Sequence, residues 1–88
     1  MATLVSTGFT NVQGFRKAYQ DTRAEALKKL NMVGKRVRFS SNCFLLQTYM
    51  NGQWVNHVNG LSAAEDKVRM YTLKAEDTEF RLVMNFDT

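Results

Sequence analysis

The chain has 88 residues and a formal net charge of +4, and its composition is 44% hydrophobic and 23% charged. These values exclude a largely disordered chain, and the length predicts a single domain over residues 1–88. No apolar run is long enough to span a membrane, and the first residues lack the pattern of a signal peptide. Cys43 is the only cysteine, so no internal disulfide forms and we expect a cytoplasmic protein.

Basic residues are concentrated in the first half of the chain. Residues 1–45 carry eight Lys or Arg and two acidic residues, whereas residues 46–88 carry four Lys or Arg and six acidic residues. The two halves therefore have net charges of +6 and −2. This asymmetry predicts a basic patch that faces an anionic partner, although a modest charge that serves only solubility explains it about as well.

The N-terminal third predicts a short strand and one long helix. Residues 3–9 contain β-branched residues, which favour a strand. Thr10 and Gln13 then match a capping box, with Asn11 as a competing N-cap, and we expect the helix to run to about Asn31. Apolar residues recur every three or four positions along it and so share one face: Val12, Phe15, Tyr19, Ala26 and Leu30, with Thr22 between them.

After the helix the pattern changes to the two-residue period of β-strands. Residues 36–39 and 43–50 predict two strands. Asn51-Gly52 predicts a type I′ turn that leads into a third strand over residues 53–58. The two-residue loop sets the register, which pairs Met50 with Gln53, Tyr49 with Trp54, Thr48 with Val55 and Leu46 with His57.

The segment 61–73 gives two conflicting signals. Ser62 and Glu65 match a capping box, which favours a helix, whereas residues 68–73 are β-branched and aromatic, which favours a strand. We expect one helical turn at 62–66 and a strand at 67–73. A polar loop at 74–78 and an alternating strand at 80–86 complete the chain.

The predicted fold class is α+β, an antiparallel sheet of about five strands with one long N-terminal helix packed on one face. If residues 62–72 form a helix instead, the element order becomes β-α-β-β-α-β, which is the ferredoxin-like order. The two versions differ in whether the C-terminal half contributes a second helix.

Catalytic chemistry has little support in the sequence. His57 is the only histidine and Cys43 the only cysteine, which excludes a zinc site built from such ligands. A dyad of these two residues lacks any accompanying motif. We therefore expect a protein that is not an enzyme and that holds no cofactor and no metal.

One constellation of residues suggests a binding surface. In the predicted register, arginines and aromatic residues share the sheet face opposite the helix: Arg36, Arg38, Tyr49, Trp54, Arg69, Tyr71 and Arg81. A secondary basic patch of Lys28, Lys29 and Lys35 lies near the helix end. Leu45 and Val58 add apolar surface to that face.

Trp, Tyr and Arg are the usual hot-spot residues of protein interfaces, and they also stack on unpaired bases. We therefore expect a small regulator or inhibitor, of a kind that bacteriophages also encode, which docks on a host or cellular protein with an acidic surface. The alternative is nucleic-acid or nucleotide binding by the same face, with single-stranded nucleic acid as the partner. A homodimer is a further alternative, and no membrane partner is expected.

Overall fold

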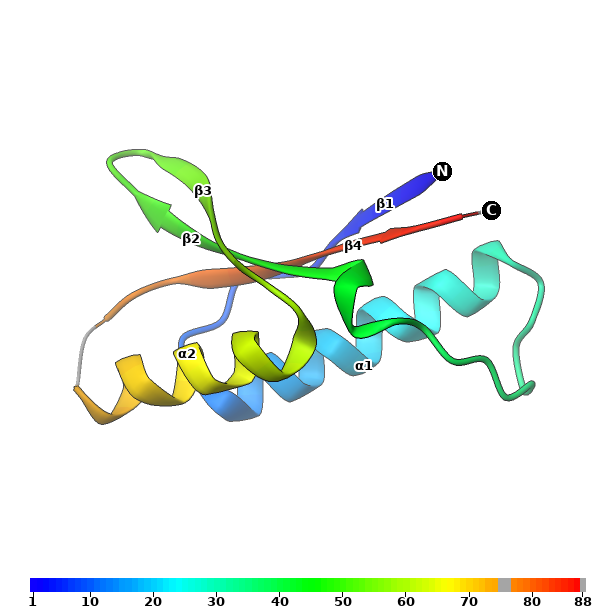
Figure 1. The fold of residues 1–88 in the computed structure, drawn as a ribbon, viewed down its shortest axis with the longest axis horizontal. Helices are drawn as coiled ribbons and strands as arrows, with labels where there is room; N and C mark the ends of the chain where they lie inside the picture. Colours follow the sequence, from blue (N-terminus) through cyan, green and yellow to red (C-terminus); the bar gives the residue numbers. More distant parts are fainter. Residues whose placement is uncertain (75–76, 88) are drawn as a thin grey trace.

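The computed structural model describes residues 1–74 and 77–87, and its described strands form one antiparallel sheet (Figure 1). The elements are β1 (Ala2–Val5), α1 (Val12–Lys29), the 3-10 helix η1 (Ser41–Cys43), β2 (Phe44–Met50), β3 (Gln53–Asn59), α2 (Leu61–Leu73) and β4 (Phe80–Phe86). The fold class α+β is confirmed. The sheet has four strands in the order β1-β4-β2-β3, so the expected version with about five strands is wrong, and the alternative element order β-α-β-β-α-β is the observed one.

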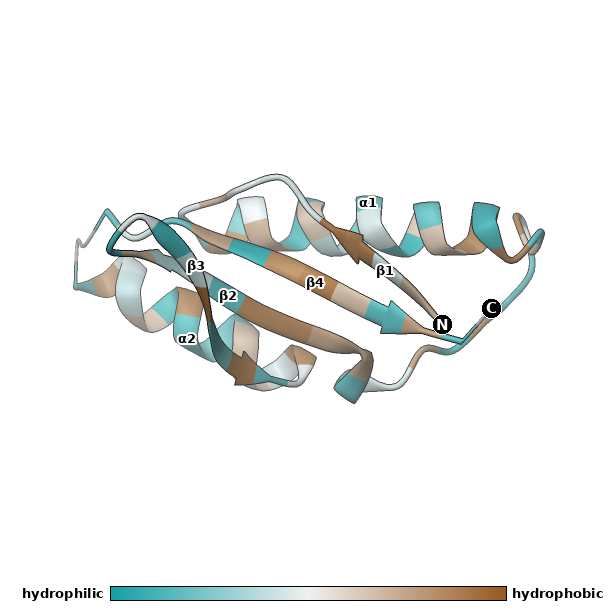
Figure 2. Cartoon of the chain, turned by 90° about the horizontal axis from the view of Figure 1, so that it is seen from above, coloured by the Kyte–Doolittle hydropathy of each residue, from teal (hydrophilic) through white to brown (hydrophobic). Residues whose placement is uncertain are grey.

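Both helices lie on the same face of the sheet (Figure 1). When the molecule is viewed from the sheet side, α1 lies behind β1 and β4, and α2 lies behind β2 and β3 (Figure 2). β4 separates β1 from β2, and β2 separates β3 from β4, so both β-α-β units are split. As a result β4 and β2 occupy the centre of the sheet, and no described helix covers its second face.

The helix α1 follows the predicted stripe. Its buried residues Phe15, Ala18, Thr22 and Ala26 recur at intervals of three or four and face the sheet. The N-cap is the competing residue Asn11, whose Oδ1 accepts a hydrogen bond from the Gly14 amide at 2.8 Å. The capping box predicted at Thr10 is therefore wrong, because the short Asn11 side chain already satisfies the amide three residues on.

The helix α2 replaces the strand that we expected at residues 67–73. Ala64 and Val68 are buried and Tyr71 packs against the core, and their spacing of four and three places them on one helix face. Gly60 is the N-cap and has no side chain to offer, so Ser41 Oγ accepts from the Leu61 amide at 2.7 Å. The β propensity of the segment is overridden by this packing.

The strand expected at residues 36–39 is also wrong, since these residues form an irregular loop. Arg23 Nη2 donates to the Val37 carbonyl at 3.2 Å, which ties the loop to α1 rather than to a strand. Phe39 packs edge-on against Phe86, with ring centroids 6.2 Å apart. The loop is thus anchored to both layers near the end of the sheet.

The hairpin turn is confirmed, because Asn51 and Gly52 have φ of 51° and 80°, both positive as a type I′ turn requires. The predicted pairs of Met50, Tyr49 and Thr48 are confirmed as well. A β-bulge then shifts the register, so Leu46 pairs with Val58 and the predicted pairing of Leu46 with His57 is wrong. The bulge turns Val58 towards the core instead of the outer face.

The core fills the space between the sheet and the two helices. Its largest buried side chains are Phe15, Phe44, Leu46, Val68, Phe80, Leu82 and Met84. Alternate residues of β4 are buried in the core as predicted, with Arg81 and Asn85 on the other face, where Val83 is also buried. Of the polar loop expected at 74–78, residues 75–76 lie outside the described residues.

Candidate binding face of the sheet

The sheet face away from the helices is the candidate site (Figure 2). Successive residues of a strand point to opposite faces, so the strand residues that alternate with the core residues point to this side. They are Thr3, Val5, Leu45, Gln47, Tyr49, Trp54, Asn56, Asn59, Arg81, Val83 and Asn85. We call this set the open sheet face. Arg81 is its one charged residue.

Five residues of the open sheet face form a connected group, Gln47, Tyr49, Trp54, Asn56 and Arg81, which we call the Trp54–Arg81 cluster. The Arg81 guanidinium lies over the Trp54 ring, 4.4 Å from the ring centroid. The Tyr49 ring packs against that of Trp54, with ring centroids 5.2 Å apart. Cation–π contact and cross-strand packing thus hold three interface-type side chains together.

Hydrogen bonds fix the polar half of the cluster. Arg81 Nε donates to Gln47 Oε1 at 2.7 Å, and Gln47 Nε2 donates to Asn56 Oδ1 at 3.0 Å. The three residues sit side by side because Gln47 pairs with both Arg81 and Asn56 in the sheet register. The sequence predicted Arg81 for this face but not these hydrogen bonds, since the pairing of β4 with β2 leaves no local signal in the sequence.

An apolar strip borders the cluster. Val83 pairs with Val5 on one side and with Leu45 on the other, so these three side chains form a row across three strands. Val83 is only 7% exposed although no described helix covers it. Cluster and strip together combine aromatic and aliphatic side chains with two amides and a single cation, and a surface with few charges is typical of an interface centre.

The structure brings together three of the seven residues that the sequence predicted for this face, namely Tyr49, Trp54 and Arg81. The other four lie elsewhere, and their predicted placement is wrong. Arg36 and Arg38 belong to the loop after α1, because residues 36–39 do not form a strand. Arg69 and Tyr71 belong to α2, on the opposite side of the sheet.

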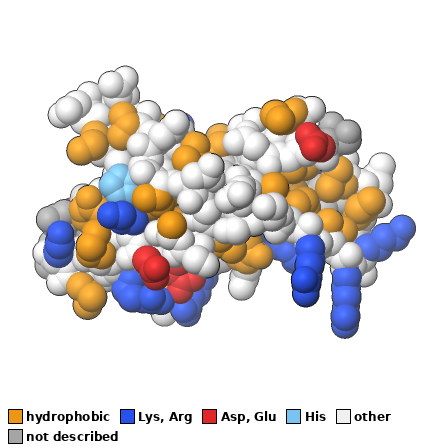
Figure 3. All heavy atoms as spheres, in the orientation of Figure 1, with side chains coloured by type: hydrophobic (Ala, Val, Ile, Leu, Met, Phe, Trp, Pro, Cys, Tyr) orange, Lys and Arg blue, Asp and Glu red, His pale blue; other side chains and the backbone are white. Residues whose placement is uncertain are grey.

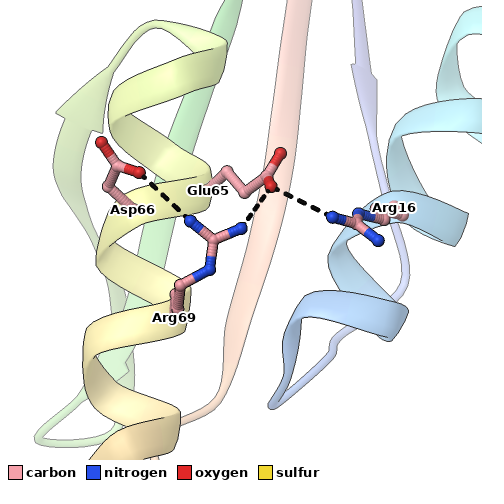
Figure 4. Close-up of polar contacts among 4 residues, drawn as sticks. All are labelled: Arg16, Glu65, Asp66 and Arg69. Carbon is pink, nitrogen blue, oxygen red and sulfur yellow. Dashed lines mark hydrogen bonds and ion pairs between the residues drawn. The ribbon is translucent and has the colours of Figure 1, made fainter.

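Arg69 is engaged in an ion-pair network between the helices (Figure 4). Glu65 Oε1 accepts from Arg69 Nη2 at 2.8 Å and lies 3.4 Å from Arg16 Nη2, while Asp66 lies 3.6 Å from Arg69. The carboxylate of Glu65 therefore bridges α2 to α1. Both arginines have carboxylate partners, which makes them weak candidates for binding an external anion.

The residues predicted as a secondary basic patch lie in two consecutive segments of the chain. Lys28 and Lys29 occupy the last turn of α1, and Lys35 lies in the loop that follows. Arg36 and Arg38, displaced from the sheet, join them there. All five side chains are exposed.

His57 occupies the β-bulge and points to the helix side. Its ring centroid lies 5.8 Å from that of Tyr71 and 6.3 Å from that of Phe80, and its Nε2 is buried without a hydrogen-bond partner in the described part of the chain. Burial, and secondarily the charge of Lys67, lowers the pKa of His57 from its ordinary value of 6.5. Cys43 lines a different region, at the end of α1, so the structure gives no support to a dyad of Cys43 and His57.

This burial predicts a pH-dependent stability. The unfolded chain protonates His57 near pH 6.5, whereas the folded chain resists protonation to lower pH, so the free energy of unfolding decreases as pH falls below about 6.5. We expect this slope in urea unfolding followed from about pH 8 to about pH 5. His57→Gln removes the titrating group and flattens the slope in that window. An unchanged slope in the variant would assign it to other groups.

Among the described residues, no three His, Cys, Asp or Glu side chains gather where they could hold a metal ion. No described helix combines the length and the apolar character needed to cross a membrane. No protein-family model matches the chain, and neither the curated proteins nor the solved structures compared with it give a match. Function must therefore be argued from the geometry of this chain.

Proposed function

We propose that the protein is a non-enzymatic binding protein that regulates or inhibits a partner protein by docking through the open sheet face. The observation that carries the proposal is the Arg81 guanidinium stacked at 4.4 Å on Trp54, on a sheet face that no described helix covers. Trp, Tyr and Arg dominate the energetics of protein interfaces, and here all three are in contact.

The cluster is also held in place before any partner binds. Binding loses free energy when flexible side chains must be ordered, at about 0.5–1.5 kcal/mol for each rotamer-rich side chain. Gln47 fixes Arg81 by a hydrogen bond at 2.7 Å, and Trp54 supports its guanidinium plane. Much of that ordering cost is therefore absent. Arg81 has no ion-pair partner in the described part of the chain, which suits a carboxylate on an acidic partner surface.

Nucleic-acid binding by the same face loses support from the geometry. Affinity for nucleic acid depends on several phosphate contacts, and three of the four arginines that sequence reasoning placed on this face lie elsewhere. One face of the Trp54 ring is already covered by Arg81. We therefore do not propose binding of single-stranded nucleic acid as the function, and the test below distinguishes it from binding of a protein.

The test compares two truncations that remove apolar side chains from opposite layers. Trp54→Ala removes the centre of the cluster and should weaken partner binding by about 2 kcal/mol or more, roughly a thirtyfold loss of affinity. The control is Leu73→Ala on α2, whose side chain is exposed and lies on the helix side. Partners captured from a nuclease-treated lysate are compared between the variants, and dissociation constants are then measured by calorimetry.

Three outcomes contradict the proposal. If Trp54→Ala retains the partner as well as Leu73→Ala does, the open sheet face is not the docking surface. If capture disappears on nuclease treatment, the partner is a nucleic acid. If sedimentation shows a dimer that Trp54→Ala converts to monomer, the face joins two copies of the chain and the working surface lies elsewhere.

A further inference from the structure

A groove opens at the end of the molecule where α1 meets the sheet. It has a volume of about 430 Å³, which lies within the range of ligand-binding pockets. Its apolar lining is Met1, Leu30, Met32, Val37, Phe39 and Phe86. Four of these residues come from the end of α1 and the loop after it, Phe86 is the last residue of β4, and Met1 precedes β1. None of them belongs to the Trp54–Arg81 cluster.

Cations are frequent in the segments that form this groove. Arg38 lines it directly, and Lys28, Lys29, Lys35 and Arg36 belong to the same two segments as the lining residues. Figure 3 shows Lys and Arg side chains projecting from the end of the molecule where Figure 1 places the loop after α1. We call these five residues the basic rim.

The basic rim is poorly neutralised. No acidic residue occurs in the sequence between Glu25 and Glu65, and Glu25 lies 3.6 Å from Lys28. In the described part of the chain no other ion pair involves the rim. Asp87 also lines the groove and is outnumbered by the five cations. The rim therefore presents a net positive field at the mouth of an apolar groove.

The loop that carries the rim is anchored. The Lys35 amide donates to the Met32 carbonyl at 3.1 Å, and Arg23 holds the Val37 carbonyl at 3.2 Å. Phe39 packs against Phe86 at the base of the groove. These contacts hold the backbone of the loop that carries Lys35, Arg36 and Arg38 against α1 and β4.

We propose that this groove binds an acidic segment of a partner protein that inserts a bulky apolar side chain. The apolar lining, which includes two methionines that adapt to differently shaped side chains, accommodates the inserted group. The basic rim pairs with the flanking carboxylates and steers the encounter. A nucleic acid would pair with the basic rim but has no apolar side chain to fill the groove. A lipid surface would contact the rim, but the groove beside it is concave. The proposal does not depend on the open sheet face.

The test uses short labelled peptides and fluorescence anisotropy. The first peptide has a central Leu-Phe pair flanked by Glu and Asp, and the second replaces that pair by Ser-Ser. We expect the intact chain to bind the first peptide and to bind the second at least about tenfold more weakly. Val37→Ser, in the groove, should weaken binding of the first peptide, whereas Val33→Ser, exposed in the same loop but outside the lining, should not.

A charge-matched pair of variants tests the rim. Arg36→Glu with Arg38→Glu should weaken binding of the first peptide at least about tenfold. Lys17→Glu with Lys74→Glu changes the net charge equally at exposed sites away from the groove and should have little effect. Trp54→Ala should also leave binding unchanged, which separates this proposal from the one for the open sheet face.

Several results would overturn the proposal. Equal losses in the two charge variants would assign binding to net charge, and equal affinity for the two peptides would exclude the groove. Tighter binding of a single-stranded oligonucleotide, or of vesicles containing phosphatidylserine, would assign the rim to another class of partner. Failure to bind the first peptide would reject the proposed occupant.

Discussion

Phe80→Ala should lower the free energy of unfolding by about 3–5 kcal/mol, because it leaves a cavity in the core. Phe80 is fully buried in β4, and its ring contacts those of Phe9, His57 and Tyr71 at centroid distances of 6.2, 6.3 and 5.5 Å. These partners come from the segment before α1, from β3 and from α2. A single truncation therefore removes packing from three elements at once.

The loss should be a large fraction of the stability of a small domain, which is about 5–15 kcal/mol. Urea unfolding followed by circular dichroism gives the measurement. Phe80→Leu, which keeps most of the apolar volume, should cost less than about 1.5 kcal/mol. Met50→Ala at the exposed hairpin tip is the surface control. A cost for Phe80→Ala no larger than that of Met50→Ala would contradict this core arrangement.

The sequence predicted correctly those elements in which the spacing of apolar residues and the local residue types indicate the same structure. The stripe along α1, the turn at Asn51-Gly52 and the alternation of β4 each combine a clear period with suitable residue types. In α2 residue type and residue spacing disagree. Val68 and Tyr71 are residue types that favour strands, whereas their spacing from Ala64 fits one face of a helix. Burial against the core decided in favour of the spacing.

The candidate site was predicted only in part, because face assignment depends on long-range pairing. A single bulge at His57 moves Val58 from one face of β3 to the other. Arg36 and Arg38 alternate with apolar residues as a strand would, yet residues 36–39 pair with neither edge strand, β1 or β3, and form a loop. The alternating pattern alone therefore assigned Arg36 and Arg38 to the sheet face, although they lie in the loop after α1.

The displaced arginines change how the charge asymmetry is interpreted. The sequence suggested one basic aromatic face, whereas the structure separates an aromatic face with a single cation from a basic rim beside an apolar groove. Arg16 and Arg69 both pair with Glu65 between the helices, and Arg69 also pairs with Asp66. The positive charge of the first half is thus concentrated at the end of α1, while the hot-spot residues lie on the sheet.

Gly14→Ala should destabilise the fold by about 1–3 kcal/mol, even though alanine is the better helix former. A Cβ at position 14 would lie 2.6 Å from the Phe9 Cβ, closer than two carbons can approach. Phe9 cannot yield easily, because it exchanges two backbone hydrogen bonds of 2.8 Å with Phe80, and its ring packs against that of Phe15.

The close approach also explains why the chain has a glycine in the first turn of α1. Asn11 caps the helix by accepting a hydrogen bond from the Gly14 amide. Gly14 must therefore donate to this cap and also pack closely against Phe9. Gln13→Ala in the same turn is the matched control, since its side chain is exposed and its change should stay within about 0.5 kcal/mol. Melting temperatures of both variants give the measurement. If Gly14→Ala raises the melting temperature as helix propensity alone predicts, then Phe9 does not pack against the start of α1 as described.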